Sequence, residues 1–286
     1  MKILITGGLG FIGSSLGKYL VDREHEITLL SRSKRKISNI SEFKDNVEVL
    51  ILPVEEIKEE VKDFDVIFHF ASSVDNYAII ENDLNRDINI NCKGTLNLLD
   101  ACQKYNRKCR LIFGSSFFVV GKPKKLPVDE TAECNPLSLY AATRLCGEHF
   151  CKIYRNIFGL KTIIVRFVNV FGEKEQFTDK KKAAFNYMIG QVLQGKPITM
   201  YDDGLVKRDY IHISDVVRAC EVIMNKGIDG ETYFVGRGEG IMLKNLFEMI
   251  IEETPESDFI PKAYYAIRFI ELNESGALDS TSHRKL

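Results

Sequence analysis

Tyr140 and Arg144 stand four residues apart in the stretch SLYAATRLCGEHF, residues 138–150, and this spacing places both on one face of a helix. A phenol with a pKa of about 10 is a poor proton carrier near neutrality unless a nearby cation stabilises its anion. An arginine is always protonated, so it can supply that charge. The pair therefore predicts a proton-transfer site. The alternative is an ordinary surface Arg144 that pairs with Glu148 one turn later.

A second group of residues is the glycine-rich stretch TGGLGFIGS, which lies between an apolar strand and a predicted helix. Its first glycine permits a tight turn, its second lets a pyrophosphate approach the backbone, and its third lets helix and strand pack closely. The helix N-terminus offers free N–H groups and a favourable dipole to phosphates. This order predicts a dinucleotide site rather than a loop that binds nothing. We expect cofactor contacts from Gly7, Gly10, Phe11, Ile12 and Gly13.

The next predicted strand ends at Ser31 and Arg32, where an NAD-binding protein usually has an acid for the ribose hydroxyls. An arginine at this position suits a 2′-phosphate, and no carboxylate is present to repel one. We therefore expect Ser31 and Arg32 to bind the cofactor and favour NADP(H) over NAD(H). The alternative is that SRSKRK, residues 31–36, is a solvated basic loop.

The elements that must position these residues alternate between strands and helices. Strands are expected at residues 2–6, 25–31, 47–52, 65–71, 109–116 and 161–172, and helices at 11–22, 89–105 and 139–158. Such an order predicts an α/β fold, a doubly wound parallel sheet with helices on both faces. After about residue 172 the pattern loosens into a helix at 183–194, a turn-rich stretch at 195–204, and a strand running into a helix at 208–224. We expect a dinucleotide-binding domain at 1–165 and a smaller substrate-binding lobe at 166–286.

Composition narrows the function classes. The 286 residues are 45% hydrophobic and 28% charged with a net charge of −1, which is typical of a globular protein and gives no electrostatic reason to expect nucleic acid or a membrane surface. No stretch reaches the roughly 18 apolar residues of a membrane span. Because the first residues run directly into a strand and a glycine-rich turn, we do not expect a secreted protein. We expect a cytoplasmic protein with reduced thiols and no metal site, because its cysteines lack zinc spacing; they are Cys92, Cys102, Cys109, Cys134, Cys146, Cys151 and Cys220.

Seven motifs together carry a resemblance to a known family. They are TGGLGFIGS, HFASS (69–73), NINCKGTLNLLDA (89–101), FGSSFFVVG (113–121), LYAATRLCGE, VRFVNVFG (165–172) and YDDGLVKRDYIHISDVV. In this order the chain resembles the extended short-chain dehydrogenase/reductases, the NAD-dependent epimerase/dehydratases that act on nucleotide sugars. The resemblance covers nearly the whole chain and implies a Rossmann-type fold.

The resemblance also implies roles for individual residues. Tyr140 matches the acid/base tyrosine and Ser116 its partner hydroxyl, which orients the reacting oxygen. Arg144 stands where the family has a lysine that stabilises the phenolate and binds the nicotinamide ribose. Arginine keeps the charge, but its planar fork replaces a compact donor, so we expect a slower enzyme rather than a dead one. Ala71 and Asn91 match further cofactor-binding positions.

On the substrate side, Asn169 and Arg208 match positions that bind the diphosphate of a nucleotide-diphosphate sugar, and Arg268 falls near another. Dehydratase relatives follow the serine with an Asp-Glu pair. This chain has Phe117 and Phe118 there, so we do not expect dehydration.

Three functions stay open at this point. The leading one is a nucleotide-sugar 4-epimerase, and the alternatives are an NADPH-dependent 4-keto-sugar reductase and a non-catalytic nucleotide-binding relative. The resemblance further implies a homodimer built on the helices near 91–105 and 140–158. Family members continue past the point matched by residue 286, so we expect a shortened substrate lobe.

Overall fold

The computed structural model describes residues 1–73, 85–175, 184–194, 196–253 and 268–270. Seven strands form one parallel sheet in the order β10-β6-β5-β4-β1-β2-β3. They are β1 (Lys2–Thr6), β2 (Glu26–Ser31), β3 (Glu48–Ile51), β4 (Val66–His69), β5 (Arg110–Ser116), β6 (Lys161–Phe167) and β10 (Thr232–Val235). The strands that follow β1 in sequence are added first on one side of it and then on the other. This is the order of a doubly wound Rossmann-type sheet, so the predicted fold class is confirmed.

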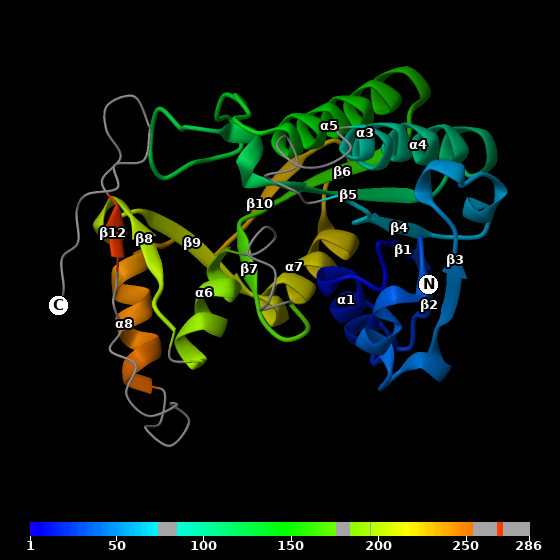
Figure 1. Ribbon diagram of the computed structural model, residues 1–286. Helices are drawn as coiled ribbons and strands as arrows, with labels where there is room; N and C mark the ends of the chain where they lie inside the picture. The colour runs from blue at the N-terminus through cyan, green and yellow to red at the C-terminus, as the bar shows by residue number, and fades with distance from the viewer. Residues whose placement is uncertain (74–84, 176–183, 195, 254–267, 271–286) are drawn as a thin grey trace. The chain divides into compact units, whose positions relative to one another are not determined.

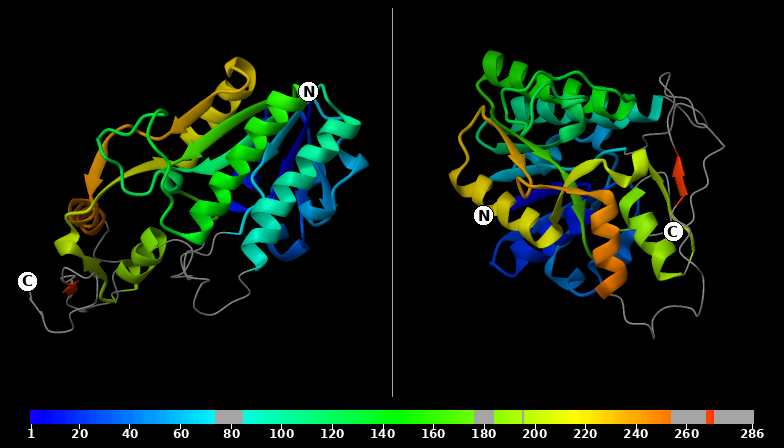
Figure 2. Two further views of the ribbon diagram at one scale, coloured as in Figure 1. Left: turned by 90° about the horizontal axis from the view of Figure 1, so that it is seen from above. Right: turned by 90° about the vertical axis from the view of Figure 1, so that its left-hand side faces the viewer.

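Helices cover both faces of this sheet (Figures 1 and 2). On one face lie α1 (Phe11–Val21) and α7 (Ile213–Lys226), and on the other α3 (Asn85–Asp87), α4 (Gly94–Tyr105) and α5 (Leu139–Phe158). Two apolar cores result, one built around residues such as Leu16 and Val216 and the other around Leu98 and Leu111. Strands buried on both faces read as continuous apolar runs, as KILIT does.

Helix α5 has the bounds that the sequence predicts, because both of its ends are specified locally. Ser138 caps the N-terminus by accepting a hydrogen bond from the Ala141 amide at 3.2 Å. Gly159 ends the helix in the left-handed conformation, with φ of +71°. Between them, a Cβ at Gly147 would lie 2.4 Å from the Phe113 ring, so this glycine lets α5 approach β5 closely.

Short helical turns connect the main elements. They are η1 (Lys34–Ile40), η2 (Lys44–Asn46), η3 (Val54–Glu56), η4 (Glu59–Val61), η6 (Phe117–Val120) and η7 (Asp202–Gly204), while η5 (Ile88–Lys93) is a π-helix that runs into α4. The sequence pattern predicts one continuous helix over 89–105. The structure divides it, because π-type pairing replaces α-type pairing over its first turn.

The chain forms two compact units. The first comprises residues 1–174 and 211–236, and the second 175–210 and 237–286. The first unit thus includes segments that the sequence analysis assigns to the second lobe, because β10 pairs with β6 and α7 packs against α1. It also includes β7 (Asn169–Phe171), which follows β6 after one residue.

The second unit contains α6 (Ala184–Leu193), β8 (Thr199–Tyr201), most of β9 (Lys207–His212), β11 (Gly240–Met242), α8 (Leu243–Glu253) and β12 (Arg268–Ile270). Strand β11 pairs antiparallel with β9, and β12 pairs parallel with β8. Val192, Met200 and Phe247 form its apolar core. The stretch 195–204, predicted to be rich in turns, contains the short strand β8. Among the described helices, none is long and apolar enough to cross a bilayer.

Candidate active site

The predicted site residues of the first unit gather at one edge of the sheet, because parallel strands all end on the same side. Thr6, Ser31, His69 and Ser116 are the last residues of β1, β2, β4 and β5. Strands β2 and β4 lie on opposite sides of β1, so the order in which successive strands join the sheet reverses at β1. In open α/β sheets, ligands bind at the carboxyl ends of the strands at such a reversal.

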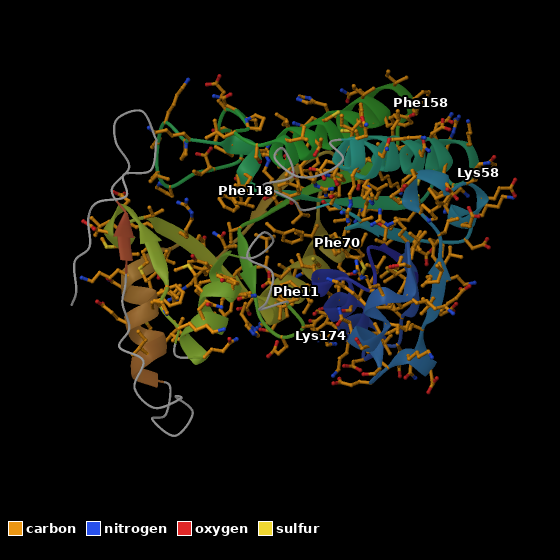
Figure 3. The ribbon with its side chains drawn as sticks, viewed as in Figure 1. Phe11, Lys58, Phe70, Phe118, Phe158 and Lys174 are labelled. Atoms are coloured by element: carbon orange, nitrogen blue, oxygen red, sulfur yellow. The ribbon has the colours of Figure 1, made fainter. Side chains whose placement is uncertain are left out.

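The glycine loop after β1 packs directly against the backbone that follows β4. Gly7 has φ of +70°, and a Cβ there would lie 2.8 Å from the Ala71 amide nitrogen. A Cβ at Gly13 would lie 2.4 Å from the Gly7 carbonyl oxygen. Phe11 and Phe70, both labelled in Figure 3, pack against the same apolar core. Both glycines are therefore required by close approaches of main chain to main chain.

The N-terminus of α1 is open to an anion. Its N-cap residue is Gly10, no side chain accepts from its first amides, and no acidic residue lies in its first turn. The amides of Phe11 and Ile12 lack intrahelical acceptors, and the helix dipole adds partial positive charge beside them. This end of the helix fits a pyrophosphate.

The basic segment after β2 is tied to the glycine loop. Arg32 is exposed, and the Ser31 hydroxyl donates to the Ser33 carbonyl at 3.0 Å. Farther along, the Asn39 side-chain amide donates to the Leu9 carbonyl at 2.9 Å. Asn39 thus holds η1 against the loop that would carry the phosphates. Sequence reasoning missed Asn39, because nothing in its local pattern indicates a partner 30 residues earlier.

His69 lies at the centre of a chain of buried hydrogen bonds. The Ala71 amide donates to the Thr6 hydroxyl at 3.1 Å, and that hydroxyl lies 2.7 Å from His69 Nδ1. On the other side, His69 Nε2 lies 2.9 Å from the Thr95 hydroxyl, which donates to the Asn91 carbonyl. These directions assign the neutral tautomer with hydrogen on Nε2. Burial, together with the charge of Arg144, lowers the pKa of His69 to about 3.

Asn91 connects the backbone after β4 to helix α5. Its Oδ1 accepts from the Ser72 hydroxyl at 3.1 Å and from the Ser73 amide at 2.9 Å. Its Nδ2 donates to the Ser73 carbonyl and to the Thr143 hydroxyl, and Thr143 donates in turn to the Tyr140 carbonyl. The amide is fully buried and these bonds use its whole capacity. The side chain therefore positions its neighbours, and a contact between Asn91 and a cofactor stays a prediction.

Tyr140 and Ser116 meet through the turn that follows β5. The Ser116 hydroxyl accepts from the Phe118 amide at 3.3 Å and so begins η6. The Phe118 ring, labelled in Figure 3, meets the Tyr140 ring edge-on with centroids 6.5 Å apart. Tyr140 is 9% exposed, and its hydroxyl hydrogen-bonds to none of the described residues. The phenol is therefore available to a ligand.

Arg144 is buried and forms no ion pair with any residue that the structure describes. It is 1% exposed, and its guanidinium carbon lies 4.3 Å from the centre of the Phe113 ring. Nη1 donates to the Ala71 carbonyl at 3.5 Å, and Nε has no partner. Burial lowers the pKa of Arg144, and Tyr140 one turn away partly offsets this. The alternative of a surface arginine paired with Glu148 is excluded.

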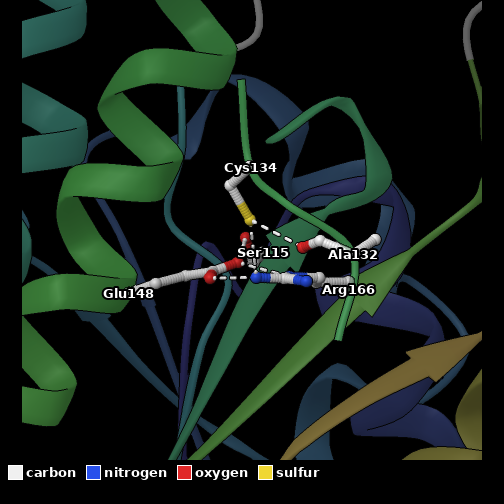
Figure 4. A network of polar contacts seen from close by, with 5 residues as sticks. All are labelled: Ser115, Ala132, Cys134, Glu148 and Arg166. Carbon is white, nitrogen blue, oxygen red and sulfur yellow. Dashed lines mark hydrogen bonds and ion pairs between the residues drawn. The ribbon is translucent and has the colours of Figure 1, made fainter. Parts of the chain in front are cut away.

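Glu148 belongs to a different buried network, drawn in Figure 4. It receives hydrogen bonds from Arg166 Nε at 2.9 Å and Nη2 at 2.8 Å, and from the Ser115 hydroxyl at 2.6 Å. Arg166 Nη2 also donates to the sulfur of Cys134 at 3.1 Å. This network joins α5, β5 and β6. Two of these elements also carry predicted catalytic residues, Tyr140 on α5 and Ser116 at the end of β5. Sequence reasoning missed it, because its members are scattered over 51 positions.

The three predicted substrate residues belong to different parts of the chain. Asn169 is half-buried in β7 of the first unit. Arg208 is exposed in β9 of the second unit, where Nη1 donates to the Lys207 carbonyl at 3.0 Å. Arg268 is the first residue of β12, which pairs with Thr199 of β8. Their role at a diphosphate stays a prediction.

A nicotinamide dinucleotide fits the residues of the first unit. The close-set glycine loop and the open N-terminus of α1 suit its pyrophosphate, and the buried Nε of Arg144 needs an acceptor that a ribose hydroxyl would provide. For metals, no three potential His, Cys, Asp or Glu ligands cluster within the described ranges.

Comparison with known proteins agrees with this geometry. The NAD dependent epimerase/dehydratase family matches residues 3–236. A putative UDP-glucose 4-epimerase of Methanocaldococcus jannaschii is 32% identical over 258 residues, 88% of this chain and 82% of the relative. Two solved structures are similar as well. The UDP-N-acetylglucosamine 4-epimerase of Methanobrevibacter ruminantium, in complex with UDP-N-acetylmuramic acid, shows 26% identity and a TM-score of 0.84, covering 96% of this chain and 86% of its own. The UDP-glucuronic acid 4-epimerase of Bacillus cereus, in complex with NAD, shows 27% and 0.83, covering 95% and 86%.

The buried neutral His69 predicts a loss of stability in acid. Its pKa is about 3 in the folded state against 6.5 for an ordinary histidine, so between these values the unfolded chain binds the extra proton. Its contribution is complete above pH 6.5 and falls by up to about 1.4 kcal/mol for each pH unit below that. Urea unfolding from pH 7 to pH 4 should therefore show a shallower pH dependence in His69→Gln than in the wild type. The exposed His149→Gln serves as the control, and equal slopes for all three proteins would contradict the assignment.

Proposed function

Because the chain belongs to the NAD dependent epimerase/dehydratase family, we propose that it is a nucleotide-sugar 4-epimerase, which oxidises and reduces the sugar at its 4-position. One observation carries the proposal above the others. Arg144 is a buried guanidinium with no carboxylate partner among the described residues, one helical turn from the free hydroxyl of Tyr140. A cation so placed costs free energy unless a ligand uses it.

The residues divide the chemistry between them. A bound nicotinamide supplies hydride acceptance and return. The Tyr140 phenolate, stabilised by Arg144, takes the proton from the sugar 4-hydroxyl, and the resulting phenol later gives that proton back. The Ser116 hydroxyl keeps its hydrogen for the reacting oxygen while its own oxygen accepts from the Phe118 amide. Phe117 and Phe118 stack with ring centroids 4.3 Å apart, so this turn presents no carboxylate for dehydration.

The diphosphate of the substrate is assigned to Asn169, Arg208 and Arg268, as the family resemblance implies. Relatives support the substrate class, since the Methanobrevibacter ruminantium enzyme was solved with UDP-N-acetylmuramic acid. A forked arginine suits phosphate oxygens, and the exposed guanidinium of Arg208 retains free donors, since it gives one hydrogen bond to the Lys207 carbonyl.

A homodimer through α4 and α5 is part of the same proposal. These helices contact each other and expose large apolar side chains, among them Leu96, Ile153, Ile157 and Phe158, the last labelled in Figure 3. Exposed apolar patches of this kind mark contact surfaces. A cytoplasmic location stays a prediction, supported by seven cysteines that are all free thiols.

Replacing the proposed acid/base should abolish turnover and spare binding. Tyr140→Phe removes the hydroxyl that carries the proton, so kcat with UDP-glucose should fall by about 10²–10⁴-fold. Cofactor affinity, measured by fluorescence titration, should stay within about twofold. Tyr154→Phe on the same helix is the matched control. Turnover above a tenth of the wild-type rate in Tyr140→Phe would remove this residue from the mechanism.

Arg144→Met separates a ligand-binding role from a structural one. Glu148 keeps its pair with Arg166, so the change strands no buried carboxylate and relieves the desolvation of the guanidinium. Unfolding stability should stay equal or rise, while cofactor affinity falls at least tenfold, about 1.4 kcal/mol. In contrast, Arg166→Met should cost about 3–5 kcal/mol of stability, because Glu148 is left unpaired. A destabilised Arg144→Met that binds cofactor normally would show a purely structural arginine.

Cofactor choice depends on Arg32. Relatives include an enzyme solved with NAD, whereas Arg32 and the lack of an acid beside it favour NADP(H). If Arg32 reads a 2′-phosphate, NADPH should bind at least tenfold more tightly than NADH, and Arg32→Gln should erase the difference. Arg107→Gln, an exposed arginine elsewhere on this unit, is the control. A preference for NADPH favours the keto-sugar reductase, and a preference for NADH leaves Arg32 as a solvated basic residue.

A further inference from the structure

Cys134 differs from the other cysteines in the groups that its sulfur contacts. It lies in the segment between η6 and α5 and is half-buried. Its sulfur accepts a hydrogen bond from Arg166 Nη2 at 3.1 Å, and its S–H points to the Ala132 carbonyl at 3.8 Å (Figure 4). A thiol thus rests against a guanidinium that is itself 3% exposed. Sulfur reacts with oxidants as its anion, which a neighbouring cation stabilises.

Arg166 keeps one donor unused beside this sulfur. Nε and Nη2 each donate one hydrogen to Glu148. The second hydrogen of Nη2 points to Cys134 and lies on the other edge of the guanidinium, the one formed by Nη1 and Nη2. Nη1 is buried and has no hydrogen-bond partner. A thiol sulfur satisfies one donor of this edge. A sulfur that carries an oxygen would satisfy both.

The other six thiols lack this environment. Burial raises the pKa of Cys151 and of Cys220 to about 12, and Cys102 and Cys109 are buried as well. Two more are half-exposed, Cys92 and Cys146, and these contact each other. The pKa of Cys92 is about 12, raised first by burial and then by Cys146. Within the described part of the chain, a cysteine sulfur hydrogen-bonds to a cationic side chain at Cys134 alone.

We propose that Cys134 is a site of reversible oxidation by hydrogen peroxide, with Arg166 as the group that binds the oxidised sulfur. The Cys134 sulfur attacks one peroxide oxygen, so an S–O bond forms as the O–O bond breaks. The thiol is oxidised to a sulfenic acid, and the peroxide is reduced to water by taking up the thiol proton. The new oxygen accepts from Nη1 and Nη2 of Arg166.

The modification reaches the candidate active site through the network of Figure 4, a consequence that rests on the proposed function. Arg166 holds Glu148, and Glu148 holds the Ser115 hydroxyl next to Ser116. An oxygen on Cys134 would take up the Nη1–Nη2 edge of Arg166 and so shift the guanidinium that holds Glu148. Arg166, Glu148 and Ser115 act here as positioning residues, since they touch no reacting atom.

The segment that carries Cys134 is also fastened to the turn after Ser116. The Asn135 amide donates to the Val120 carbonyl at 3.3 Å. A Cβ at Gly121 would lie 1.9 Å from the Asn135 carbonyl oxygen, so the two backbones are in close contact. A change in volume at Cys134 is therefore passed to η6, whose Phe118 contacts Tyr140.

Peptide mapping of the wild-type protein tests the proposal. The full chain is treated briefly with hydrogen peroxide in the presence of dimedone, which traps sulfenic acids, and the reaction is stopped with catalase. Mass spectrometry should find Cys134 labelled at least about fivefold faster than Cys146, which is also partly exposed. Cys146→Ser is the matched control and should leave the label on Cys134 unchanged. Labelling of Cys134 no faster than that of Cys146 overturns the proposal.

Turnover gives an independent readout of the coupling. In the wild type and in Cys146→Ser, peroxide without dimedone should lower kcat in proportion to oxidised Cys134, and dithiothreitol should restore it. Cys134→Ser should retain its own untreated rate under the same exposure. Equal loss in Cys134→Ser overturns the coupling to the site. If the untreated protein shows no turnover with any nucleotide sugar, the proposed function fails, while the labelling ratio still decides the oxidation site.

Discussion

The site depends on a buried guanidinium, that of Arg144, which has no carboxylate partner among the residues that the structure describes. Burial removes water from the Arg144 guanidinium. Its contacts are then the face of the Phe113 ring and a long hydrogen bond to the Ala71 carbonyl. Phe113 lies within β5 and Ala71 follows the end of β4, so the cation requires β4, β5 and α5 to meet at one place. The Gly147 contact with Phe113 lets α5 come close enough for this. Among the described residues, Nε of Arg144 meets no hydrogen-bond acceptor, so this buried donor can bind a ligand.

The surrounding polar residues show the opposite property, because they satisfy one another. Asn91 has no unused donor or acceptor, and His69 is held between two threonine hydroxyls in one tautomer. Such saturated networks are rigid and fix the geometry of whatever they support. Unused capacity is left at Tyr140 and at the start of α1, where a ligand would meet it. Rigid support around a few open donors is the arrangement that positions a substrate without reorganisation.

Features that depend on neighbouring residues could be predicted from the sequence. Contacts between residues far apart in the sequence could not. The bounds of α5 follow from a capping serine and a left-handed glycine, and the glycine loop follows from its place between strand and helix. The partners of Arg144 could not be predicted from sequence spacing. A carboxylate four residues later on a helix, here Glu148, often pairs with an arginine, but Glu148 pairs instead with Arg166 of strand β6. Asn91 matched a cofactor position, but tertiary contacts with Ser73 and Thr143 consumed its amide. Strands as short as β8 and β11 carry too few residues for a periodic signal.

The division of the first unit in sequence has a consequence for its synthesis. Strand β10 closes the sheet beside β6, but 68 residues separate the end of β6 at Phe167 from the end of β10 at Val235. A nascent chain can therefore assemble six strands while β6 remains an open edge. At about 5–20 residues per second, that edge waits roughly 3–14 s for its partner. An unpaired edge strand is a template for intermolecular pairing, so the segment 175–210 sets how long the growing chain is exposed to aggregation.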